Sequence, residues 1–60
     1  MEITGYVVRL YIDGFLHSTY RVDTEADAWE KTTELLYKFG SRVSDITITE
    51  VLRYGTEETE

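Results

Sequence analysis

The fold is decided by residues 5–22, which read GYVVRLYIDGFLHSTYRV. The two halves of this stretch, 5–12 and 15–22, are rich in β-branched and aromatic residues, which are typical of β-strands. Between them stands Asp13-Gly14, a dipeptide that favours the tight turn of a β-hairpin. The stretch therefore predicts two antiparallel strands joined by a short loop.

The length of this loop determines which side chains share a face, because neighbouring residues of a strand point to opposite sides. A two-residue loop would place His17 beside Leu10, which makes a poor core. A three-residue loop over 12–14 pairs Tyr11 with Phe15 instead. We predict the three-residue loop, because the face it creates contains five core candidates: Tyr6, Val8, Leu10, Leu16 and Tyr20.

A helix is predicted over residues 25–39. Asp23-Thr24 offers a capping side chain before it, and Gly40 is a natural residue just beyond its end. At about 100° per residue, apolar and small side chains fall in one broad arc, opposite the charged residues. The arc contains Ala26, Ala28, Trp29, Thr32, Thr33, Leu36, Tyr37 and Phe39.

The run 45–54 alternates again and predicts a third strand. In the order ββαβ, a right-handed return past the helix places this strand beside the first and antiparallel to it. The expected fold is α+β, with a three-stranded antiparallel sheet of order 2-1-3 and the helix packed on one face. We expect one domain over 1–54 and a disordered acidic tail over 55–60, which has no apolar residue.

Length and composition limit the function. A domain of this size buries only about 60% of its unfolded surface, which leaves little stability for a strained catalytic site. The chain has no cysteine and a single histidine, His17, so we expect no metal site and no cofactor. No apolar run approaches the roughly 20 residues of a membrane span, and the N-terminus lacks the basic start of a signal peptide. We expect a cytoplasmic protein with no membrane association.

Catalysis is not expected either. His17 and Ser18 are neighbours on one strand, so Ser18 should point toward the core side and away from His17. A nucleophile needs a base within hydrogen-bond reach, and the chain has no second histidine or cysteine. We therefore predict no catalytic residue.

The helix can cover one face of the sheet, which leaves the other face open. In the predicted register this face carries three of the four arginines, the histidine and two aromatic residues, but no acid. Bases stack on aromatic rings while guanidinium groups contact phosphates or bases, so the combination indicates RNA or single-stranded nucleic acid. The predicted binding residues are Arg9, Tyr11, Phe15, His17, Arg21 and Arg53.

The net charge of the chain is also compatible with partners other than nucleic acid. Twelve acidic and six basic residues give a net charge of −6, which disfavours nucleic acid if the charge is evenly spread. The acidic helix face with Asp27, Glu30 and Glu34, together with the tail, could instead bind a basic host protein in place of DNA. The open face or a strand edge could also form a weak homodimer, with a monomer as the other expectation. Arg, Thr and Tyr are, moreover, ordinary residues on a solvated sheet face.

In size and composition the chain resembles small acidic phage-encoded proteins that divert host processes early in infection. The resemblance rests on a short, acidic, cysteine-free chain with a compact core. It implies a host macromolecule as the target and a regulatory role, and it assigns no function to individual residues.

Overall fold

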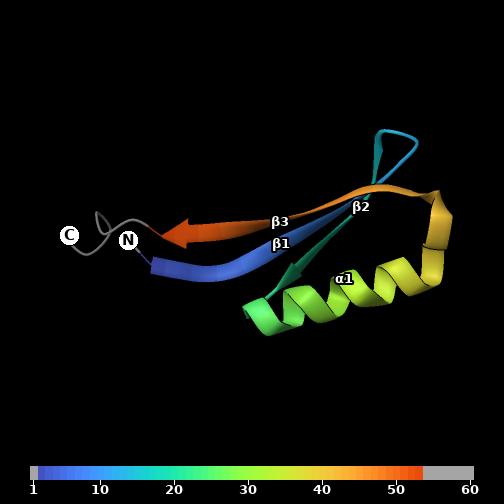
Figure 1. Cartoon of the computed structure of the whole chain (residues 1–60). Helices are drawn as coiled ribbons and strands as arrows, with labels where there is room; N and C mark the ends of the chain where they lie inside the picture. Colours follow the sequence, from blue (N-terminus) through green and yellow to red (C-terminus); the bar gives the residue numbers. More distant parts are fainter. Residues whose placement is uncertain (1, 54–60) are drawn as a thin grey trace.

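The computed structural model describes residues 2–53 and shows the α+β fold that the sequence predicts (Figure 1). Three antiparallel strands form one sheet in the order β2-β1-β3, and one helix packs on that sheet. The elements are β1 (Glu2–Ile12), β2 (Phe15–Val22), α1 (Glu25–Phe39), the 3₁₀ helix η1 (Gly40–Arg42) and β3 (Val43–Arg53). The predicted strand order is confirmed, while the predicted tail over 55–60 lies outside the described residues.

The hairpin turn differs from the prediction. Ile12 pairs directly with Phe15, so the loop has two residues, and both carry a positive φ, 56° at Asp13 and 81° at Gly14. Positive φ at both positions is the geometry of a type I′ turn, whose twist matches that of the flanking strands. The predicted pairing of Tyr11 with Phe15 is therefore wrong, because Tyr11 pairs with Leu16.

A β-bulge in β2 follows the turn and returns the residues beyond it to the faces that the sequence predicts. The register shifts after Tyr11, so that Leu10 pairs with Ser18 and His17 is the extra residue of β2. An extra residue in one strand reverses the faces of everything beyond it. Tyr20 consequently pairs with Val8, and its predicted place on the core face is confirmed although its partner differs from the predicted register. Leu16 lies before the bulge, and the prediction that it belongs to the core is wrong, since its side chain is 54% exposed.

The helix begins and ends where the sequence predicts. The Thr24 hydroxyl accepts a hydrogen bond from the backbone N–H of Asp27, and the Gly40 N–H donates to the carbonyl oxygen of Leu36. The predicted apolar arc is partly wrong, because it omitted Leu35, which is buried, and included Tyr37, which is 94% exposed.

The core lies between α1 and one face of the sheet. Its fully buried side chains come from the central strand β1 and from the helix, and half-buried residues of all three strands surround them. The buried hydrophobic residues of this core are Val8, Leu10, Ala28 and Leu35.

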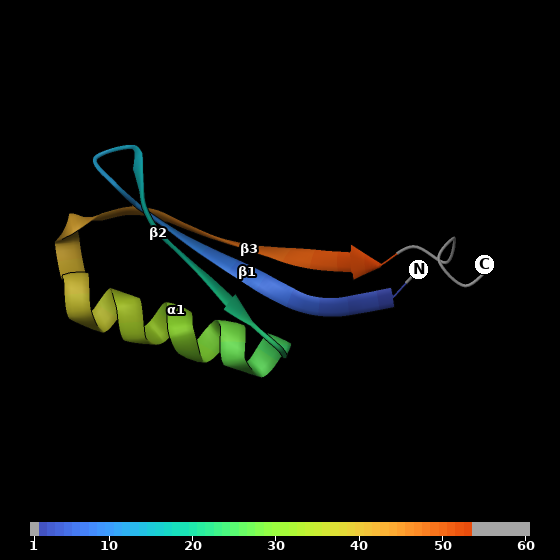
Figure 2. The same ribbon diagram turned by 180° about the vertical axis from the view of Figure 1, so that it is seen from behind.

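The two views show that α1 runs along one side of the sheet, while β1 and β3 continue past the helix as a two-stranded ribbon (Figures 1 and 2). Residues 2–5 of β1 belong to this ribbon and pair with β3 rather than β2. Within residues 2–53 no helix is long and apolar enough to cross a membrane.

Candidate nucleic-acid interface

The face of the sheet opposite to α1, called the open face below, is defined by the strand register. Its central residues alternate with the core residues of β1; Val7, Arg9 and Tyr11 have partners on both β2 and β3, whereas Gly5 and Glu2 pair with β3 alone. The open face contains Glu2, Gly5, Val7, Arg9 and Tyr11 of β1, Leu16, Thr19 and Arg21 of β2, and Asp45, Thr47, Thr49, Val51 and Arg53 of β3.

Arg9 and Arg21 are two of the three arginines of this face, and both lie near its centre. Arg21 pairs with Val7, and its Nε and Nη2 atoms lie over Gly5, where a Cβ atom would be. Arg9 Nη1 donates a hydrogen bond to Thr49 Oγ1 at 3.3 Å, across the β1–β3 ladder. Val7 pairs with both Arg21 and Thr49, so it lies beside both arginine side chains. The structure brings together two of the six predicted binding residues at the centre of the face.

Gly5 is a site residue that the sequence prediction missed. It is buried although it lies on the open face, because the Arg21 side chain covers it. A glycine inside a strand pattern indicates a close approach of another group, so its position in residues 5–12 was the available signal.

Tyr11 follows Arg9 on the open face and is half-buried. Its partners are Leu16 on β2 and Asp45 on β3, so one apolar and one acidic side chain flank the ring position. Tyr11 is the aromatic residue of this face among the described residues, and it is one of the two that the sequence predicted there.

Phe15 and His17 do not lie at the predicted site. Phe15 pairs with Ile12, which packs against the core cluster, so Phe15 belongs to the helix side and is 76% exposed there. His17 sits in the bulge, and its ring meets the edge of the Phe39 ring at the end of α1, with centroids 5.2 Å apart and planes at 66°. The prediction that both residues line the open face is wrong because the turn is shorter and the bulge follows it.

The open face also carries acids, contrary to the prediction. Asp45 pairs with Tyr11, and its Oδ1 accepts a hydrogen bond from the Ile46 N–H at 2.9 Å. At the other end Glu2 pairs with Arg53, and their Oε1 and Nη1 atoms lie 3.9 Å apart. The first strand was predicted from residue 5, so Glu2 lay outside it. Asp45 began the predicted third strand, but it was left out of the residues assigned to the open face. The positive centre of the face is therefore Arg9 and Arg21, with a carboxylate near each end.

The bulge also overturns the expected separation of His17 from Ser18. His17 Nδ1 and Ser18 Oγ lie 2.6 Å apart, a hydrogen-bond distance, whereas regular alternation would have put them on opposite faces. A nucleophilic serine also needs a third group that orients the base, whereas the His17 ring packs against the apolar Phe39 ring. Within residues 2–53 no group of three or more His, Asp or Glu side chains is suited to a metal ion.

Comparison with known proteins adds no assignment to this geometry. No family model matches the chain, and no match is found among curated proteins or solved structures.

Proposed function

We propose that this protein is a small non-enzymatic domain that binds RNA or single-stranded nucleic acid on its open face. The observation that carries the proposal is the placement of the Arg9 and Arg21 guanidinium groups on one sheet face, the first at Thr49 and the second over Gly5. Tyr11, the next residue of β1 on that face, supplies a ring for one base. The binding residues of the proposal are therefore Arg9, Tyr11 and Arg21, with Arg53 at the margin.

Dimensions and chemistry support this choice. Strand residues rise by about 3.4 Å, so Gly5 to Tyr11 spans about 20 Å, which suits a short single strand better than a duplex. Guanidinium groups form paired hydrogen bonds with phosphate and also stack on bases, whereas Val7 beside them offers an apolar contact. Base–aromatic stacking contributes about 1–3 kcal/mol per base, so one ring and two arginines support weak binding.

The net charge of −6 weakens binding without abolishing it. The helix layer lies about 10 Å from the sheet in a packed α/β arrangement, and the Debye length at physiological salt is about 8 Å. The carboxylates of α1 are therefore largely screened from a strand bound on the other side. Asp45 and Glu2 remain close, and they favour a binding track that crosses the centre of the face between them.

The test is a fluorescence-anisotropy titration with a labelled single-stranded oligouridine at several salt concentrations. Arg9→Gln and Arg21→Gln should each weaken binding and should each reduce the slope of log K against log salt by about 0.7. Arg42→Gln is the matched control, because it removes the same charge from the exposed η1 segment.

An absence of binding at low salt would overturn the proposal. Equal losses for Arg42→Gln and for the two open-face variants would also overturn it, since the attraction would then depend on total charge and not on this face. NMR shifts of the oligouridine complex should fall on Arg9, Tyr11 and Arg21 and not on Phe15 or His17.

A further inference from the structure

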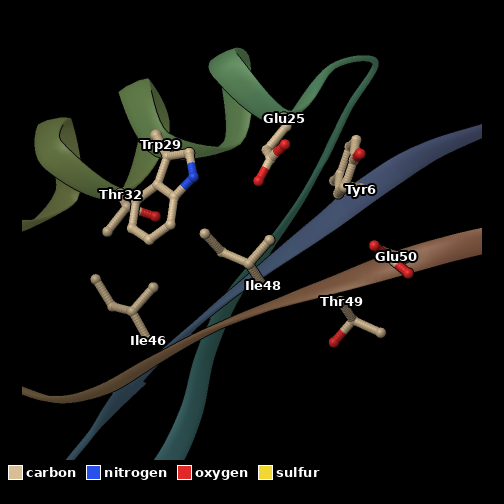
Figure 3. A pocket seen from close by; sticks show the side chains of 8 residues that line it. All are labelled: Tyr6, Glu25, Trp29, Thr32, Ile46, Ile48, Thr49 and Glu50. Carbon is tan, nitrogen blue, oxygen red and sulfur yellow. The ribbon is translucent and has the colours of Figure 1, made fainter.

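An open groove separates the helix from the edge strand β3 on the core side of the sheet (Figure 3). Its volume is about 620 Å³, which is within the usual range for ligand sites of about 300–1,000 Å³. Residues of α1 form one wall and residues of β3 form the other, with Tyr6 of β1 between them at one end. The wall of α1 consists of Glu25, Trp29 and Thr32, and the wall of β3 consists of Ile46, Ile48, Thr49 and Glu50.

The groove exists because the two flanks of α1 differ. On the flank toward β2, Lys31 Nζ lies 4.8 Å from the centre of the Tyr20 ring, so the two side chains fill the space between α1 and β2 there. On the other flank Trp29 is 59% exposed, although it faces the apolar residues Ile46 and Ile48 across the groove (Figure 3). A large indole left this open beside aliphatic side chains is typical of a contact surface for another molecule.

One end of the groove is acidic. Glu25 at the start of α1 and Glu50 on β3 lie near Tyr6 at that end, and Figure 3 shows their carboxylates directed to the same side as the groove. Lys31 pairs with Glu34, and Arg53 lies 3.9 Å from Glu2. Among the described residues, neither Glu25 nor Glu50 has an ion pair with a Lys or Arg side chain. The groove therefore suits a partner that has an apolar group near Trp29 and a cationic group near Glu25 and Glu50.

The wall formed by β3 is also a strand edge. The sheet order β2-β1-β3 places β3 at the outside, where its second row of backbone groups has no strand partner within the described residues. An added strand would gain main-chain hydrogen bonds along this edge, and its alternate side chains would enter the groove.

We propose that the groove binds an extended, basic segment of a partner protein, which adds a fourth strand beside β3. Side chains two residues apart share a face and are separated by about 7 Å, the spacing between Ile48 and Glu50 on β3. The segment therefore has a large apolar side chain against Trp29 and Ile48 and, two residues away, a Lys or Arg against Glu50 and Glu25. A second copy of this chain fits less well, because each copy carries a net charge of −6 and the same two acids.

The test uses the intrinsic fluorescence of Trp29, which is the single tryptophan of the chain. The probe is a synthetic peptide with a Thr-Leu-Thr-Arg repeat, which contains no tryptophan. Binding should shift the Trp29 emission to the blue and protect it from iodide, because the indole becomes covered. A Thr-Thr-Leu-Arg repeat has the same composition but places Leu and Arg on opposite faces, and a Thr-Leu-Thr-Glu repeat reverses the charge; both should bind more weakly.

Variants distinguish peptide binding at the groove from a general attraction of the basic peptide to the acidic residues of the chain. Glu25→Gln and Glu50→Gln should each weaken peptide binding by about twofold to fivefold at low salt, as expected for partly exposed ion pairs. Glu30→Gln, which changes the same charge on the exposed side of α1, should leave it unchanged. For variants without the indole, NMR titration replaces fluorescence: Trp29→Ala should weaken binding about tenfold or more, while Tyr37→Ala should have no effect.

Three results would overturn the proposal. The first is an unchanged emission spectrum at millimolar concentrations of the alternating peptide. The second is an equal affinity for the three peptides, or an equal loss for Glu30→Gln and Glu50→Gln. The third is a concentration-dependent blue shift without peptide, which would identify a second copy of the chain as the occupant. Oligouridine is expected on the opposite face, so a Trp29 shift with oligouridine would instead contradict the placement of nucleic acid on the open face.

Discussion

Arg21 packs over Gly5 so closely that a Cβ on residue 5 would lie 3.0 Å from both Nε and Nη2 of Arg21 and 2.9 Å from the carbonyl oxygen of Val22. The guanidinium group can move away from such an atom, but the backbone carbonyl cannot. We therefore expect Gly5→Ala to destabilise the protein by about 1–3 kcal/mol, the usual cost of overpacking. Urea unfolding followed by circular dichroism measures it.

The Arg21→Ala background shows which contact is responsible. Because the Val22 carbonyl remains in place, Gly5→Ala should cost nearly the same in that background as in the original chain. A cost that vanishes with Arg21→Ala would mean that the side chain, and not the strand backbone, fills the space above Gly5.

The contact of His17 with Phe39 supports a second prediction. An edge-to-face aromatic pair contributes about 0.5–1.5 kcal/mol beyond the burial of its surface. A double-mutant cycle of His17→Ala and Phe39→Leu should therefore give a coupling free energy of this size in urea unfolding. The two changes should be additive if His17 were on the open face, and that result would contradict the observed position of the ring.

The general architecture could be predicted because it depends on the periodic patterns of whole segments. These patterns remain recognisable even when the exact hairpin register is wrong. Three alternating segments, one amphipathic segment and the Asp13-Gly14 turn are sufficient for the strand order β2-β1-β3. The hairpin register was wrong although the faces beyond it were right. A three-residue loop, and a two-residue loop followed by a bulge, both place Val8 and Tyr20 on the same face. The hydrophobic pattern cannot distinguish these solutions.

Residues near the irregularities were predicted least well. Phe15 and Leu16 lie between the turn and the bulge, where the two solutions assign opposite faces, and His17 is itself the bulged residue. On the helix, the sequence contains more large apolar residues than a core of this size can cover. Leu35 is buried while Trp29 and Tyr37 are exposed, and a broad arc on a helical projection gives no basis for that choice.

The N-cap of α1 provides a third prediction. The Thr24 hydroxyl accepts a hydrogen bond from the Asp27 N–H at 3.1 Å, and loss of such a cap costs about 0.5–2 kcal/mol. Thr24→Ala should therefore lower the midpoint of thermal unfolding, whereas Thr24→Ser should largely retain it.

Thr33→Ala is the control for this change. The Thr33 hydroxyl donates to the Trp29 carbonyl within the helix, an interaction that adds little, and Ala has the higher helix propensity. Thr33→Ala should be neutral or slightly stabilising. An equal loss for the two Thr→Ala changes would contradict the capping role of Thr24.

The last prediction tests the register on which the open face depends. Arg9 opposes Thr19 in the structure, whereas a three-residue loop without a bulge would place Arg9 opposite His17. Directly opposed strand residues have Cα atoms about 4.5–5.5 Å apart, which is within the range a disulfide requires. The chain has no cysteine of its own, so each engineered pair can be studied alone.

Oxidation in a glutathione buffer should close the disulfide of the Arg9→Cys/Thr19→Cys protein almost completely. Arg9→Cys/Thr47→Cys, which joins opposed residues of β1 and β3, should behave in the same way and serves as the positive control. Arg9→Cys/His17→Cys should remain reduced, because the bulge directs residue 17 to the other side of the sheet, where it contacts Phe39. Preferential closure of the Arg9–His17 pair would restore the three-residue loop and with it Phe15 and His17 as residues of the open face.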